Sequence, residues 1–228
     1  MEPFSLTTQK RFIVRGIFLT LFLLFIAALF FTPLLKLAGM RDTTQLFMLS
    51  RLFIYLCLFI ILAYSVKIEK QHFLIWTEKK YAISYYFISM VALMLILFAN
   101  GIVLVAGLKL SGLYEVSKKF NEINQIMHGH TLLIVFTALT AGITEELIFR
   151  GYLLPRLALI FKKAYLSIVI SSVLFGLLHI SYGTLAQIII TGFIGLIFAI
   201  HYYKYRNIKI IIACHFLWDL LILLVQAR

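Results

Sequence analysis

The sequence predicts an all-α fold: a polytopic bundle of about seven transmembrane helices. Hydrophobic residues make up 63% of the 228-residue chain and are gathered in long runs. Several runs reach the roughly 20 apolar residues that a bilayer-spanning helix needs. They are continuous, whereas a transmembrane barrel would show short alternating segments. No long Pro-, Gly- or Ser-rich linker divides the chain, so we expect one compact unit.

Taken in order, the apolar runs predict spans at residues 13–36, 46–66, 82–108, 131–154, 164–181, 185–203 and 208–226. The first run follows Lys10, Arg11 and Arg15 and is longer than the apolar core of a signal peptide. We therefore expect it to be a retained first span.

The spans fall into two groups on either side of one polar stretch. Residues 1–110 hold helices without a recognisable motif, and residues 131–228 hold all the polar motifs described below. Residues 111–130 are the only extended polar stretch. Apolar side chains recur there at helical spacing, which predicts an amphipathic helix at the membrane interface; they are Leu113, Val116, Phe120, Ile123 and Met127.

The net charge of +12 is best explained by topology and by anionic lipid headgroups, because the basic residues cluster between apolar runs. Nucleic acid is therefore not an expected partner. With the N-terminus inside, the inner loops hold thirteen basic residues: Lys10, Arg11, Arg15, Lys67, Lys70, Lys79, Lys80, Arg156, Lys162, Lys163, Lys204, Arg206 and Lys209. The outer ends hold seven: Lys36, Arg41, Arg51, Lys109, Lys118, Lys119 and Arg228. This bias predicts a cytoplasmic N-terminus.

The sequence TEELIFRGYLLPR, residues 144–156, places charged groups directly after a run without any charge. Such groups cost roughly 2.5–3.5 kcal/mol each at membrane depth. Glu146 and Arg150 are four residues apart and share a helix face, so we expect them to pair. Glu145 points about 100° away and is left without a local partner, which makes it a candidate general base. The alternative is an interfacial Glu–Arg network that marks the end of a span.

Two further polar positions lie in the spans that follow. His179, four residues after Phe175, is the lone ionisable group of residues 164–179, although an interfacial histidine is the alternative. His215 and Asp219 share one face midway along the last span. A hydrogen-bonded pair that only locks helices together is the alternative for them.

Together these positions supply the groups that hydrolysis needs: a carboxylate to activate water, an imidazole to share the proton and donors for an oxyanion. They are also a credible metal set, because His, Glu and Asp are all zinc ligands. We predict no cofactor, and leave a metal ion such as zinc as an alternative. Cys57 and Cys214 lie inside apolar runs and predict neither a disulfide framework nor a metal motif.

The three motifs resemble the CPBP family of CAAX proteases and bacteriocin-processing enzymes, also called the Abi family. The family pattern is E-E-x-x-x-R, then F-x-x-x-H, then H-x-x-x-N or D. Order and spacing agree over roughly residues 120–226, where the Gly-rich TGFIGLIF resembles a weaker family motif. The resemblance implies an intramembrane endopeptidase in which Glu145 activates water beside His179. Glu146 and Arg150 would hold their helix in place, and His215 and Asp219 would face the oxyanion.

One position departs from the pattern of the family's eukaryotic members, which usually have Asn where this chain has Asp219. An ionised aspartate accepts hydrogen bonds only. It would either orient His215, whose imidazolium then donates, or act in its protonated form.

We therefore expect an integral membrane protease, in a bacterial cell membrane by resemblance, that cleaves a membrane-embedded or lipid-modified peptide. The substrate would be a CAAX protein, a peptide pheromone or a bacteriocin leader. A non-enzymatic binding or bacteriocin self-immunity protein is one alternative. A small transporter with a proton relay through Glu145, His179 and Asp219 is another, although no repeated halves are visible. We expect access from the cytoplasmic side, because Glu145 would lie near the inner third of its span.

Overall fold

A computed structural model describes residues 6–227 and contains helices and connecting loops but no strand within that range. Arg228, which entered the charge count, lies outside the described residues. Seven helical stretches of the described part are long and apolar enough to cross a membrane: Thr8–Leu37, Thr43–Lys67, Ile83–Leu110, Thr131–Phe161, Ala164–Tyr182, Leu185–Tyr205 and Ile208–Gln226. The predicted class, a polytopic all-α membrane protein, is confirmed.

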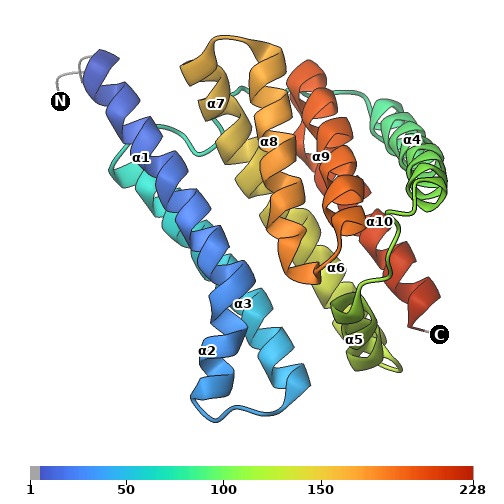
Figure 1. Ribbon diagram of the computed structural model, residues 1–228. Helices are drawn as coiled ribbons and strands as arrows, with labels where there is room; N and C mark the ends of the chain where they lie inside the picture. The colour runs from blue at the N-terminus through green and yellow to red at the C-terminus, as the bar shows by residue number, and fades with distance from the viewer. Residues whose placement is uncertain (1–5, 228) are drawn as a thin grey trace.

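The core of the bundle consists of α6 (Thr131–Glu146), α8 (Ala164–Leu178), α9 (Leu185–Tyr205) and α10 (Ile208–Gln226). Helices α6 and α10 pack together, as do α8 and α9, and Figure 1 shows the four side by side. A π-helical turn, η2 (Leu147–Leu153), continues α6 into α7 (Leu154–Phe161). The fourth span is therefore longer than the predicted 131–154. Pro155 has no backbone N–H, which interrupts the regular helical hydrogen bonding at the start of α7.

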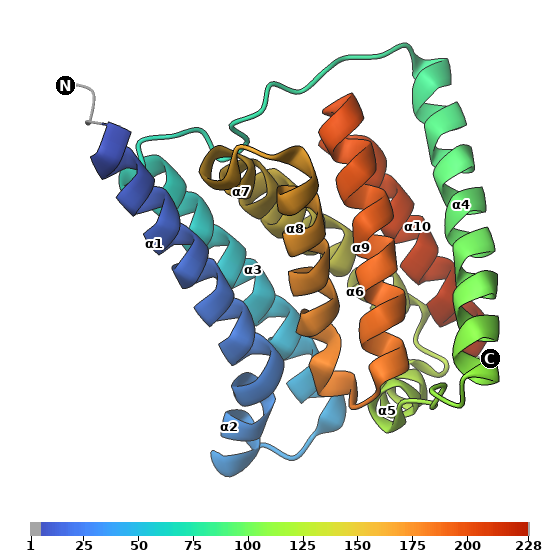
Figure 2. The ribbon, with the colours of Figure 1, turned by 45° about the horizontal axis from the view of Figure 1, so that its top comes forward.

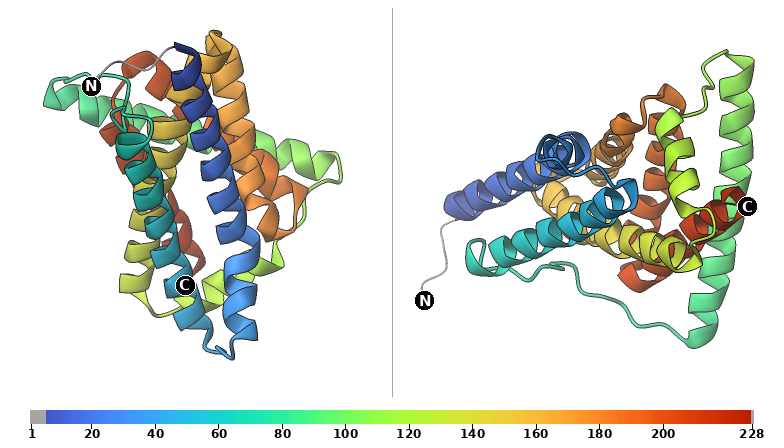
Figure 3. Two further views of the ribbon diagram at one scale, coloured as in Figure 1. Left: turned by 90° about the vertical axis from the view of Figure 1, so that its left-hand side faces the viewer. Right: turned by 90° about the horizontal axis from the view of Figure 1, so that it is seen from below.

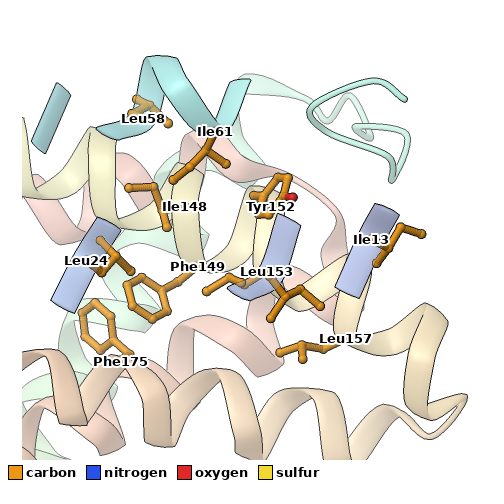
Figure 4. Packing of buried hydrophobic residues seen from close by; sticks show 11 residues of the cluster. Ile13, Leu24, Leu58, Ile61, Ile148, Phe149, Tyr152, Leu153, Leu157 and Phe175 are labelled. Atoms are coloured by element: carbon orange, nitrogen blue, oxygen red, sulfur yellow. The ribbon is translucent and has the colours of Figure 1, made fainter. Parts of the chain in front are cut away.

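Two helical groups flank this core (Figure 2). On one side, α1 (Leu6–Phe25), the π-helical turn η1 (Ile26–Phe30) and α2 (Phe31–Leu37) form a hairpin with α3 (Thr43–Lys67). On the other side, α4 (Ile83–Leu110) packs against α9 and α10. Figure 4 shows the apolar cluster that joins the hairpin to the core, in which Ile13, Leu24, Leu58 and Ile61 meet side chains of η2, α7 and α8.

The polar stretch between α4 and α6 is helical over a shorter range than predicted. Helix α5 covers only Lys118–Met127, and the side chain of Ser117 caps its N-terminus by accepting from the N–H of Phe120. Leu113 and Val116 precede the helix and are exposed. Gly112, with a φ of +71°, turns the chain after α4, so the expected apolar face is shortened to Phe120, Ile123 and Met127.

The two ends of the bundle differ in character. The N-terminal end of α1, the loop 68–82 and the α7–α8 and α9–α10 turns lie at one end. The α2–α3 turn, α5 and the C-terminal end of α10 lie at the other (Figures 1 and 3). We call the first the N-terminal end and the second the α5 end.

The N-terminal end is closed by a buried polar network that the sequence did not reveal. Arg156, counted above as a loop cation, is fully buried; its guanidinium donates to Glu69 Oε2 over 2.9 and 2.7 Å and to Ser65 Oγ over 2.7 Å. Tyr152 donates to Glu69 Oε1 over 2.6 Å. A Cβ on Gly16 of α1 would overlap the Tyr152 hydroxyl, so glycine lets α1 pack over this network.

Candidate active site

The acid pair lies at the end of α6, immediately before the π-helical turn η2. Insertions of this kind are frequent at functional sites because they re-aim side chains. One turn earlier, Gly142 brings the backbones of α6 and α10 together: a Cβ there would lie 3.0 Å from both Ile212 O and Phe216 N. Any larger residue would push α10, and with it His215, away from α6.

Glu146 is the centre of a buried three-residue network. Its Oε1 accepts from Arg150 Nη1 over 2.8 Å, as the i, i+4 spacing predicted, and lies 2.7 Å from His215 Nδ1. Arg150 also donates from Nη2 to Gly195 O over 2.9 Å, and its guanidinium lies 4.4 Å from the centre of the Phe175 ring. Glu146 and Arg150 side chains are both 0% exposed, so each charge needs the other.

Gly195 explains how Arg150 reaches α9. A Cβ at this position would lie 2.9 Å from Phe175 and 3.1 Å from Arg150 Nη2. On the neighbouring turn, a Cβ at Gly176 of α8 would lie 3.1 Å from Gly192 Cα of α9. The small residues of α9 therefore allow close helix approach.

Glu145 differs from its neighbour in having no hydrogen-bond partner among residues 6–227. Its nearest polar contact is His215 Nε2, 4.0 Å from Oε2, and its side chain is 12% exposed. The predicted lack of a local partner is confirmed. A carboxylate in this position has its lone pairs available for a water molecule or a substrate.

His179 lies where α8 ends and a 3-10 turn, η3 (His179–Tyr182), begins. Its Nδ1 lies 3.1 Å from the carbonyl oxygen of Phe175. Since a carbonyl can only accept, Nδ1 carries a proton, and Nε2 of the neutral ring is the acceptor. The Phe175 ring contacts the rings of both His179 and His215, with centroids 5.3 and 6.1 Å apart.

Asp219 contacts His215, as their spacing of four residues predicts. Its Oδ2 lies 3.5 Å from His215 Nε2, and its side chain is 29% exposed. The hydrogen bond that holds the His215 ring comes instead from Glu146 at Nδ1. The residue that orients His215 is therefore Glu146, an assignment that needs a contact between positions 69 apart in the chain. Asp219 faces the same ring nitrogen as Glu145.

Two cavities meet at this cluster. The larger, of about 710 Å³, lies between α4, α5, α9 and α10 and is lined by Glu145, His179, His215 and Asp219. The smaller, of about 190 Å³, lies between the α1–α3 hairpin and α5. Glu145, His179, Tyr182 and Arg51 line both.

The cavities extend toward the α5 end. Their walls include Lys36 and Thr43 beside the α2–α3 turn, Tyr114 before α5 and Gln226 at the end of α10. The cavities therefore extend away from the N-terminal end of the bundle. Because α6 continues through η2 into α7, Glu145 lies near the middle of its span rather than close to the N-terminal end.

The described residues contain no ready-made set of metal ligands. No group of three or more His, Cys, Asp or Glu side chains in that part of the chain is placed to hold one. Glu146 and His215 already bind each other, and Glu146 also binds Arg150. We therefore derive no step through a metal.

Part of the chain matches a model of a known protein family. Residues 127–221 match the family model described as type II CAAX prenyl endopeptidase Rce1-like. This part of the chain is similar to that family, and we call it the Rce1-like segment. All seven residues of the predicted site lie inside the match, and the resemblance to the CPBP family is confirmed. The matched family is one of peptide hydrolases, in agreement with the predicted class of enzyme. Neither the curated proteins nor the solved structures give a match.

The Rce1-like segment does not supply the whole wall of the site. Arg51 of α3 and Lys119 of α5 line the cavities but precede residue 127. From the sequence alone, both were assigned only to the basic residues that set the orientation of the spans. The one signal available was that Arg51 lies within an apolar run, where a guanidinium is costly without a purpose.

Proposed function

We propose that the protein is an intramembrane endopeptidase in which Glu145 activates the water molecule that attacks the peptide bond. The observation that carries this proposal is the junction of the two cavities, where an unpaired carboxylate lies beside two imidazoles. A carboxylate that makes no structural hydrogen bond is free to act as a general base.

The contacts of His179 and His215 suggest a different role for each in the reaction. Water would lose a proton to Glu145 as its oxygen attacks the carbonyl carbon, with His179 Nε2 accepting a hydrogen bond from the same water. His215, held at Nδ1 by Glu146, would carry a proton on Nε2, because two acidic side chains face that nitrogen. This N–H is available to donate to the oxyanion. Glu145 would then return the proton to the leaving amine as the C–N bond breaks.

The larger cavity supports a substrate with a bulky apolar group. Its volume of about 710 Å³ lies within the range of small-molecule sites. Its walls are rich in apolar side chains such as Phe98, Ile102, Val105, Trp218 and Ile222. A lipid-modified or membrane-embedded peptide suits such a cavity, with a CAAX-type protein favoured over a pheromone or a bacteriocin leader by the Rce1-like match.

The experiment compares the peptides of cells that express the wild type with those of cells that express Glu145→Gln at equal levels. Mass spectrometry of membrane and secreted fractions should show termini that disappear only in the variant, and these termini name the substrate. Glu115→Gln, at an exposed position outside both cavities, is the matched control and should behave as wild type. Identical profiles for wild type and Glu145→Gln, under conditions in which a deletion has a phenotype, would favour the non-enzymatic binding or immunity role.

The charge bias supports a cytoplasmic N-terminus, also after Arg156 is removed from the count because it is buried. With this orientation and a bacterial cell membrane, the cavities would be reached from the outer side. An inverted orientation would give access from the cytoplasm. The site's own geometry is the same in both cases.

A further inference from the structure

We infer that Arg51 and Lys119 form an anion subsite that binds the C-terminal carboxylate of the substrate. This inference rests on the proposed endopeptidase function and assigns to it two specificity-determining residues. Both residues precede the Rce1-like segment and come from elements outside the catalytic motifs.

In the part of the chain that the structure describes, neither cation has an acidic partner at ion-pair distance. In the described part of the chain, the only polar contact of Arg51 runs from Nε to Ser50 Oγ at 3.4 Å, so no contact there uses the two terminal nitrogens of its guanidinium. Lys119 Nζ donates over 2.9 Å to the Oγ of Ser181, and this acceptor is neutral.

The side chains of Arg51 and Lys119 lie close to each other and are held in place by their neighbours. Both side chains are half-buried. The Arg51 guanidinium lies 5.0 Å from the centre of the Phe47 ring, and Lys119 Nζ lies 5.5 Å from that of Tyr182. Burial lowers the pKa of Lys119, and the positive charge of Arg51 lowers it further. Glu122 raises this pKa by less than these two effects lower it, so a bound anion would relieve the remaining repulsion between the two like charges.

The two cations lie in the same cavity as the proposed reacting groups. Arg51 and Lys119 both line the smaller cavity, as do Glu145 and His179. The other two charged side chains of that cavity, Lys36 and Glu122, are exposed. A peptide whose apolar group occupies the larger cavity would therefore pass Glu145 and end in the smaller one, beside two cations. An extended segment of about three residues spans roughly 10 Å.

The test uses one farnesylated CAAX-type peptide in two forms, with a free C-terminal carboxylate or with a C-terminal amide. Kinetics of cleavage are measured for protein in lipid nanodiscs, and binding of the same peptides is measured for the inactive Glu145→Gln variant. We expect the wild type to cleave the acid about 10–100-fold better than the amide in kcat/KM, because charge-assisted hydrogen bonds are lost with the amide. Glu145→Gln should bind the acid more tightly than the amide.

The double variant Arg51→Gln/Lys119→Gln should lose this preference: the ratio of kcat/KM for the acid to kcat/KM for the amide should fall to about 1. Lys118→Gln, at the exposed neighbouring position outside both cavities, should keep it. Glu145-dependent cleavage of acid and amide at equal rates would overturn the subsite and leave the endopeptidase intact.

A phosphate group of the lipid headgroup is the other source of an anion, and the same assay identifies it. If the double variant slows cleavage of both peptides equally, and only in nanodiscs that contain an anionic lipid, the cations bind lipid and the inference is wrong. A peptide that is neither cleaved by the wild type nor bound by Glu145→Gln would overturn the proposed function together with the subsite.

Discussion

The Glu146–Arg150 pair allows a quantitative test of the buried network. Replacing Arg150 with Met removes the cation while keeping most of the apolar volume of the side chain, and leaves the fully buried Glu146 with His215 alone. It also removes the hydrogen bond to Gly195 O. Breaking a buried ion pair by removing one partner costs about 3–5 kcal/mol, so we expect a loss of stability in this range.

The double variant Glu146→Gln/Arg150→Met sharpens this prediction. Arg150→Met leaves the charge of Glu146 unpaired, and adding Glu146→Gln removes that charge. The double variant should then be about 0.5–3 kcal/mol more stable than the sum of the single effects predicts. The free energy of unfolding in mixed micelles, followed by helical circular dichroism as SDS is increased, measures all three variants. Additive effects would refute the reasoning, since they would mean that the pair is not coupled.

Two other predictions concern helix packing and the direction of access. Gly176→Val should separate α8 from α9 and destabilise the protein by about 1–3 kcal/mol, because a Cβ at this position would already lie 2.6 Å from Ile188 O. The same unfolding assay measures this loss, and an unchanged free energy of unfolding would contradict the close approach of the two helices. Cys57 and Cys214 are buried, so single cysteines can be introduced without interference. Ser181→Cys and Lys162→Cys should react with a membrane-impermeant thiol reagent from opposite sides, and labelling of both from one side would refute our placement of the cavities.

The features that the sequence predicts well are those that depend on neighbours along the chain. The seven spans follow from hydropathy, because a helix must satisfy its own backbone groups in lipid. The Glu146–Arg150 pair follows from helical spacing. The limits of the amphipathic helix were missed, since apolar spacing alone did not reveal that Gly112 and Ser117 delay its start.

The features that the sequence did not predict depend on contacts between distant positions. The bond between Glu146 and His215 exists because Gly142 lets α10 approach α6, and no local pattern specifies that contact. Arg156 was assigned to a loop because the span was expected to end at residue 154, whereas it pairs with Glu69, 87 positions away. Glu145 was expected near the end of its span for the same reason: η2 and α7 lengthen the span, so that Glu145 lies near its middle.

The distribution of unpaired charge separates the stabilising end of the molecule from the end that we propose to be functional. At the N-terminal end, the guanidinium of Arg156 binds Glu69 and lies 3.7 Å from the Tyr152 ring, so the charge is fully satisfied. Toward the α5 end, Glu145 and Arg51 both face cavities and neither forms an ion pair or hydrogen bond with an oppositely charged group closer than 4.0 Å. A chain that pairs its buried charges fully at one end is able to do so at the other. Leaving these groups unpaired is costly in a membrane, and a substrate that supplies the missing partners explains why the cost is tolerated.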